Sequence, residues 1–148
     1  MEAVMRSPQQ KPTRVLIVDQ NPMSRQLTAE YLQAAGYDVV SVATGERALV
    51  LLREWPRRTD WLCTVVELPG LVDGWILADE YHQTHPSRPV IYADGKSVER
   101  RTKPHAIFLQ GLVSPMAVLR ALRQAEALSA QPSTVLSKGG EWELGIAA

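Results

Sequence analysis

Three acidic residues, Asp19, Glu67 and Asp94, each lie just beyond or near the end of a predicted strand. Carboxylate oxygens are the ligands that hard cations such as Mg²⁺ prefer. If these strands are parallel neighbours, their carboxyl ends meet at one edge of the sheet, where ligand sites lie in open α/β sheets. The pattern therefore indicates either a cation or small-ligand site, or three solvated carboxylates on loops.

The remaining reactive side chains do not indicate enzymatic chemistry. No glycine-rich phosphate-binding motif follows the first predicted strand, and no base is spaced to pair with a nucleophile. Cys63 lies inside a predicted central strand, where a thiol packs as a small buried hydrophobe. His82 and His85 have no Cys or carboxylate at metal-ligand spacing. We therefore expect a protein that is not an enzyme and needs no cofactor.

The elements that must position these residues follow from the alternation of two sequence patterns. Runs of β-branched and aliphatic residues, typical of buried strands, alternate with longer segments of helical period. Parallel strands need crossover connections, so this alternation predicts an α/β fold with a doubly wound, five-stranded parallel sheet. The predicted strands comprise residues 14–19, 38–43, 61–66, 90–93 and 106–109.

The predicted helices carry start and stop signals. Asn21 and Ser114 can cap helices that begin with a proline, at Pro22 and Pro115, where the missing N–H has no cost. Two more helices are predicted over residues 45–55 and from about residue 74 to 85. In the first helix, apolar residues recur at the spacing of an amphipathic helix, namely Met23, Leu27, Tyr31 and Leu32.

The composition fits a single globular domain. The chain has 148 residues, 16 Lys and Arg against 16 Asp and Glu, and one Cys. Balanced charge argues against a dedicated nucleic-acid binder, and no apolar run approaches the ~20 residues that span a bilayer. The first twelve residues lack the apolar core of a secretory signal. We expect a cytoplasmic protein with a flexible segment at 1–12, a domain over 13–130 and a tail over 131–148.

The ordered motifs resemble a CheY-like response-regulator receiver domain. Residues 15–25, VLIVDQNPMSR, resemble the family's first strand and helix start, and residues 36–49 resemble its second strand and helix. Leu68-Pro69-Gly70 with Asp73-Gly74 resembles the loop that follows the phosphoacceptor strand, with one extra residue before Asp73. The resemblance spans residues 14–128 and implies the flavodoxin-like, CheY-like fold.

The resemblance also implies a phosphorylation site, most of which this sequence lacks. The family holds Mg²⁺ with two adjacent acids, but here Asp19 is followed by Gln20. The phosphoacceptor position is occupied by Val65, which has no side-chain oxygen. Asp94 stands at the family's Thr/Ser position. We therefore interpret the chain as a degenerate receiver, a pseudo-receiver, whose remnant pocket comprises Asp19, Gln20, Glu67, Asp94 and, at the family's Lys position, Gln110.

Two segments depart from the family's usual length or pattern. Between Asp94 and Gln110 the chain runs roughly six residues shorter than the family, well over one helical turn. The family's fourth helix, which would fall in residues 96–104, is therefore expected to be shortened or lost. In the tail, Gly139-Gly140 separates two segments that could pair as a β-hairpin, and a disordered tail is the alternative.

The resemblance implies a phosphorylation-independent signalling or adaptor module that acts by protein–protein interaction. Its partner would be another protein, such as a component of two-component signalling, or a second copy in a homodimer, and neither nucleic acid nor membrane is expected. The alternative is a small-ligand or cation sensor that uses the residual acidic pocket, with Asp19, Glu67 and Asp94 as the candidate metal ligands.

Overall fold

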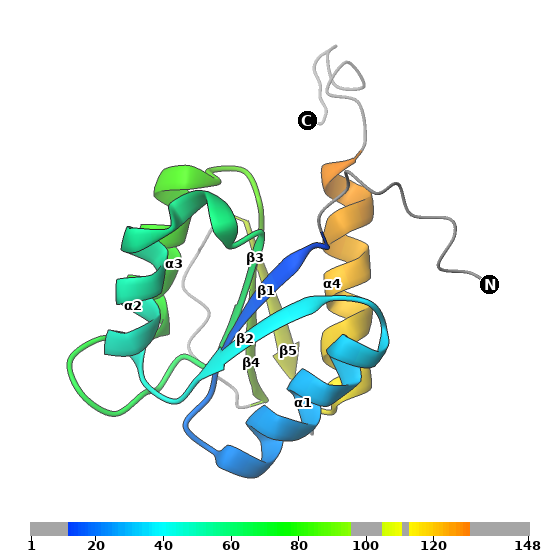
Figure 1. Ribbon diagram of the computed structural model, residues 1–148, viewed down its shortest axis with the longest axis horizontal. Coiled ribbons are helices and arrows are strands. Elements are labelled where there is room, and N and C mark those ends of the chain that lie inside the picture. The colour runs from blue at the N-terminus through cyan, green and yellow to red at the C-terminus, as the bar shows by residue number, and fades with distance from the viewer. Residues whose placement is uncertain (1–11, 96–104, 111–112, 131–148) are drawn as a thin grey trace.

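The computed structural model describes residues 12–95, 105–110 and 113–130 (Figure 1). Five strands form one parallel sheet in the order β2-β1-β3-β4-β5. This arrangement confirms the predicted α/β fold with a doubly wound, five-stranded parallel sheet. The strands are β1 (Arg14–Val18), β2 (Asp38–Val42), β3 (Trp61–Thr64), β4 (Val90–Gly95) and β5 (Ala106–Gln110).

Four α-helices among the described residues cover the two faces of the sheet. They are α1 (Pro22–Ala34), α2 (Gly45–Glu54), α3 (Gly74–Thr84) and α4 (Pro115–Ser129), and a short 3₁₀ helix, η2 (Pro56–Arg58), follows α2. Helices α1 and α4 lie on one face, and α2 and α3 lie on the other (Figure 1). Within the described part of the chain, no helix is long and apolar enough to cross a membrane.

The described part has four α-helices, as expected if the family's fourth helix is shortened or lost. The segment on which that prediction falls, residues 96–104, lies outside the described residues. The predicted tail hairpin and N-terminal segment also lie outside them, apart from Pro12. The domain boundaries at residues 13 and 130 stay predictions.

Side chains at the helix starts cap the helices as the sequence predicts. The Asn21 side-chain oxygen accepts hydrogen bonds from the backbone N–H groups of Met23 and Ser24, both at 3.0 Å. Ser114 Oγ accepts from the N–H of Ala117 at 3.2 Å. These bonds satisfy backbone donors that have no partner within the helix, so they fix where each helix begins.

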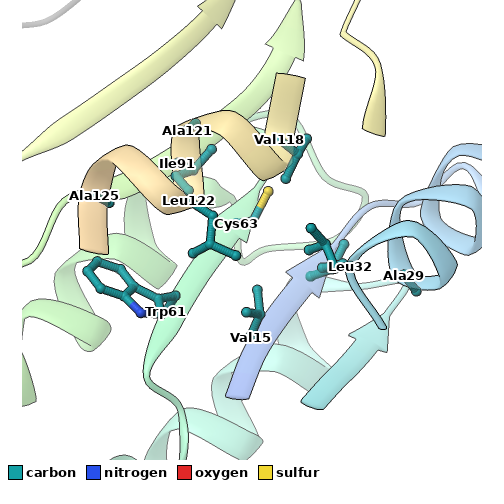
Figure 2. Close-up of a cluster of buried hydrophobic side chains, with 11 residues drawn as sticks. Val15, Ala29, Leu32, Trp61, Cys63, Ile91, Val118, Ala121, Leu122 and Ala125 are labelled. Atoms are coloured by element: carbon teal, nitrogen blue, oxygen red, sulfur yellow. The ribbon is translucent and has the colours of Figure 1, made fainter. Parts of the chain in front are cut away.

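The core on the α1–α4 face joins the middle of the sheet to both helices (Figure 2). Trp61 and Cys63 of β3 contribute to it, as does Leu32 of α1, which is fully buried. Burial raises the pKa of the Cys63 thiol to about 12, and the nearby charge of Asp19 adds to the effect. Cys63 is therefore a packing residue, as expected, and not a nucleophile.

An aromatic cluster covers the outer part of the sheet on the other face. The Tyr92 and Phe108 rings stack with centroids 4.8 Å apart, and the Trp75 ring lies 4.9 Å from that of Tyr92. Phe108 lies on the edge strand β5, where one face would otherwise lack apolar cover. Trp75, from the first turn of α3, supplies part of that cover from within the domain.

The apolar pattern of α1 is only partly the buried face. Leu32 is fully buried, but Met23, Leu27 and Tyr31 are 70%, 50% and 38% exposed. These three residues lie four apart, so they form one stripe on the helix. At 100° per residue that stripe lies opposite the face of Ala29 and Leu32, which packs on the sheet. The helix is confirmed, but three of its four pattern residues face outward; we call Met23, Leu27 and Tyr31 the α1 stripe.

Candidate functional site: the pocket at the carboxyl ends of the strands

Asp19 and Val65 lie next to each other in the extended hydrogen-bond ladder, one residue beyond β1 and β3. The N–H of Val65 donates to the carbonyl of Val18 at 3.1 Å, and the N–H of Asp19 donates to the carbonyl of Val42 at 3.1 Å. Both residues line a pocket of about 280 Å³ at the carboxyl ends of the strands. The structure therefore brings these two predicted site residues together, at the edge where such sheets bind ligands.

The first turn of α1 holds the Asp19 carboxylate. Its Oδ1 accepts a hydrogen bond from the N–H of Asn21 at 3.0 Å, and its Oδ2 accepts one from Ser24 Oγ. Arg25 Nη1 donates to the Asp19 carbonyl at 2.8 Å. The helix N-terminus adds favourable positive potential. Sequence reasoning missed Ser24; its place five residues after Asp19, in the first helical turn, was the available signal.

Val65 gives the pocket an apolar wall. Its side chain is half-buried, and its predecessor Thr64 is only 1% exposed. The Thr64 hydroxyl donates to the Val65 carbonyl at 2.8 Å, so this hydroxyl is engaged with the backbone. Neither residue offers a carboxylate at the place where the resemblance puts the phosphoacceptor.

The other predicted pocket residues are more dispersed. Gln20, Glu67 and Gln110 are exposed, and none of them lines the pocket. Asp94 belongs to β4 itself, which runs two residues further than predicted, and its side chain lies outside the described part. Among the described residues, no three His, Cys, Asp or Glu side chains lie together as a metal site would need. Metal binding by Asp19, Glu67 and Asp94 stays a prediction.

The loop from β3 to α3 is anchored close to Val65. Gly74 N–H donates to the Val66 carbonyl at 2.8 Å, and a Cβ on Gly74 would lie 2.5 Å from the Val65 carbonyl oxygen. Only glycine allows the start of α3 to approach this closely. Asp73, whose Oδ1 accepts from the N–H of Ile76 at 3.0 Å, caps the helix. The Asp73-Gly74 pair therefore has a structural role beside the pocket.

A contact from α2 holds the same loop on its outer side. Glu46 Oε2 accepts a hydrogen bond from the N–H of Leu71 at 2.8 Å. That bond lowers the pKa of the Glu46 carboxyl below its ordinary value. Sequence reasoning missed this contact because it joins residues 25 positions apart.

Comparisons with known proteins agree with this geometry. The family model for the response regulator receiver domain matches residues 15–107. A response regulator receiver protein from Sinorhizobium medicae is 22% identical, with a TM-score of 0.72 over 81% of this chain and 97% of that one. The receiver domain of the hybrid histidine kinase CckA is 27% identical, with a TM-score of 0.64 over 76% and 97%. Vibrio cholerae CheY4 is 22% identical, with a TM-score of 0.63 over 78% and 99%. No curated protein matches significantly.

Proposed function

Because this chain belongs to the response regulator receiver domain family, we propose that it is a pseudo-receiver: a phosphorylation-independent signalling or adaptor module that acts by protein–protein interaction. The observation that carries the proposal is Val65, which stands beside Asp19 where the family places its phosphoacceptor. An acyl phosphate requires a carboxylate, and valine has none.

The rest of the pocket supports the same proposal. The family holds Mg²⁺ with two adjacent acids, whose summed negative charge attracts the ion. Here Asp19 supplies one acid, which accepts hydrogen bonds from Asn21 and Ser24, and the neighbouring position is the neutral, exposed Gln20. Gln110 stands where the family has a lysine and carries no charge to neutralise a phosphoryl group. The phosphoacceptor, the second acid and the lysine of the family's site are therefore absent together.

The α1 stripe supports action by protein contact. Met23, Leu27 and Tyr31 place exposed apolar side chains in one row on a helix whose opposite face is packed on the sheet. Contact with a partner would remove such an apolar row from water, which is favourable in free energy. The proposed partner is a protein of two-component signalling or a second copy of this chain, and a cytoplasmic location belongs to the same proposal.

The experiment is an affinity capture from the source cell with the immobilised chain, with and without acetyl phosphate. The proposal expects the same captured proteins in both conditions. The Leu27→Glu variant should lose the capture, whereas Val50→Glu, which changes an equally exposed residue of α2, should retain it. Capture that requires the phosphodonor would overturn phosphorylation independence, and capture unaffected by Leu27→Glu would remove the α1 stripe from the proposal.

A second candidate function is a cation or small-ligand sensor in the same pocket. It is favoured by the position of Asp19 on the wall of a pocket of about 280 Å³. A ligand that binds only the native state raises the melting temperature. A thermal-shift titration with Mg²⁺ therefore separates the cation sensor from the adaptor module.

A further inference from the structure

A larger cavity, of about 600 Å³, lies at the opposite end of the sheet from the pocket already described. Its walls come from the start of β1, from η2, from the start of β3, from the loop before β4 and from the last turn of α4. Figure 1 shows the start of β1 beside the end of α4, at the amino ends of the strands. We call this cavity the arginine cleft, after four of its charged lining residues: Arg14, Arg57, Arg58 and Arg88, which accompany Asp60 and Glu126.

The two carboxylates of the cleft are already engaged. Asp60 Oδ2 accepts a hydrogen bond from the backbone N–H of Arg14 at 2.8 Å, and its Oδ1 lies 3.9 Å from Arg88 Nη1. Glu126 Oε1 accepts from the Tyr37 hydroxyl at 2.7 Å. These contacts leave neither carboxylate paired with an arginine of η2.

The arginines divide into two structural residues and two that form no ion pair with any described residue. The Arg14 guanidinium is bound to Asp38 Oδ2, with Nε and Nη2 both at 2.8 Å. Arg88 Nη1 also donates to the Asp60 carbonyl, at 2.9 Å. Arg57 and Arg58 are exposed, and no carboxylate of the described residues forms an ion pair with either. Within the described part of the chain, no ion pair neutralises their charges.

Aromatic rings orient two of the guanidinium groups. Arg58 lies over the Trp55 ring at 5.6 Å from its centroid, and Arg88 lies over the Trp61 ring at 5.1 Å. Stacking holds a planar guanidinium in place without using its N–H donors. Groups held in this way lose less side-chain entropy when a ligand binds.

A neighbouring histidine, His85, lies within reach of the charges of Arg88, Asp60 and Arg57. His85 Nδ1 is buried and has no hydrogen-bond partner in the described part of the chain, and its ring stacks on that of Tyr81. Burial, and then the charges of Arg88 and Arg57, lower the pKa of His85, although Asp60 opposes them. The imidazole therefore stays neutral at neutral pH and adds no charge of its own.

We propose that the arginine cleft binds a small ligand carrying a phosphate group, with Arg57 and Arg58 as the residues that contact the phosphate. With Asp38, which binds Arg14, counted beside Asp60 and Glu126, four arginines face three carboxylates, and the positive charge that remains on Arg57 and Arg58 suits a phosphate group. The planar guanidinium donates two parallel hydrogen bonds to such a group. The cavity volume is within the range of small-molecule sites.

The α4 wall of the cleft fixes the orientation of the ligand. Glu126 and the last carbonyls of α4 carry negative potential, because the C-terminus of a helix is the negative end of its dipole. The phosphate is therefore directed away from this wall and toward η2. The uncharged part of the ligand would lie against α4. This site lies at the other end of the sheet from Val65, and it does not depend on the function proposed above.

The test is isothermal titration of the full chain with pyrophosphate, glycerol 3-phosphate and ADP, and with succinate as a dicarboxylate of similar charge. The double variant Arg57→Gln/Arg58→Gln removes the two charges that form no ion pair with a described residue. The control Arg47→Gln/Arg120→Gln removes two exposed charges that do not line the cleft. Melting curves test whether both variants fold. We expect both to fold, since exposed surface residues contribute little to stability.

We expect the phosphate compounds to bind the wild type and the control alike, and to bind the double variant about tenfold or more weakly. Amide NMR shifts should centre on residues 57, 58 and 61 and not on residues 19 and 65. Preference for ADP over glycerol 3-phosphate would indicate a nucleotide, and the reverse a phosphorylated metabolite. Equal binding by the double variant, shifts centred on Val65, succinate binding as tight as phosphate, or no binding at millimolar concentration would each overturn the proposal.

Discussion

The backbone N–H of Val65 donates to the carbonyl of Val18 at 3.1 Å, which extends the β1–β3 ladder one residue past the regular strands. Because of this bond, Val65 is fixed beside Asp19, at the position that the proposed function assigns to the phosphoacceptor of a receiver. The receiver fold therefore holds an aliphatic residue beside Asp19.

The first prediction concerns phosphorylation. Incubation with acetyl phosphate or with an active histidine kinase should add no phosphate to the wild type, measured by intact mass, because Val65 has no nucleophilic oxygen. A phosphoryl adduct on Asp19 or Asp94 would contradict this. A conventional receiver treated in parallel is the positive control.

A second prediction addresses the rest of the site. The Val65→Asp variant should still be phosphorylated poorly, because Gln20 supplies no negative charge for Mg²⁺ and Gln110 supplies no cation for the phosphoryl group. The triple variant Val65→Asp/Gln20→Asp/Gln110→Lys should be modified faster than Val65→Asp alone. Intact-mass time courses compare the two. Rapid modification of the single variant would show that Gln20 and Gln110 are not limiting.

The third prediction concerns metal and stability. Receivers gather carboxylates whose mutual repulsion a cation relieves, and here Gln20 and Val65 remove two of those charges. Millimolar Mg²⁺ should therefore shift the melting temperature little, as measured by differential scanning fluorimetry with Ca²⁺ and EDTA as parallel conditions. A rise of several degrees would favour the sensor function, and its loss in Asp19→Asn would locate the ion.

The fourth prediction separates the two faces of α1. Leu32→Ala should lower the free energy of unfolding by about 2–5 kcal/mol, because it opens a cavity in a fully buried position. Leu27→Ala, at a half-exposed position of the same helix, should change it by only about 0.5 kcal/mol. Denaturant melts of both variants measure the difference. Similar losses would mean that Leu27 is covered in solution, for instance by a second copy.

The fifth prediction is a pH dependence of the loop beside the pocket. The bond from the Leu71 N–H lowers the pKa of Glu46 in the folded chain relative to the unfolded one. A carboxyl with a lowered folded pKa stabilises the fold above its unfolded pKa, and this contribution is lost as the pH falls through the folded pKa. The Leu71 amide resonance should therefore shift on acidification. Glu46→Gln, which keeps an acceptor oxygen without a titrating group, should abolish the shift.

Local sequence patterns determined the elements of this fold. Continuous aliphatic runs predicted the five strands, and an Asn or Ser before a proline predicted two helix starts, because strand burial and N-capping depend on residues close in the chain. The start of α1, where Asn21 caps Met23 and Ser24, is confirmed at the residue expected. The identity of Val65 at the end of β3 was also visible from the sequence, since it needs only the position of the strand.

Contacts between distant residues were decided only by the tertiary structure. Periodicity showed that α1 has an apolar stripe, but not that Ala29 and Leu32 would face the sheet while Leu27 faces outward, because a helix with apolar residues on two faces does not specify its own rotation. The arginine cleft depends on the same kind of information. Arg14, Arg57 and Arg88 are far apart in the sequence, and parallel pairing brings them to one end of the sheet. Charge counts are summed over the chain, whereas a binding site depends on which of those charges the fold leaves unpaired.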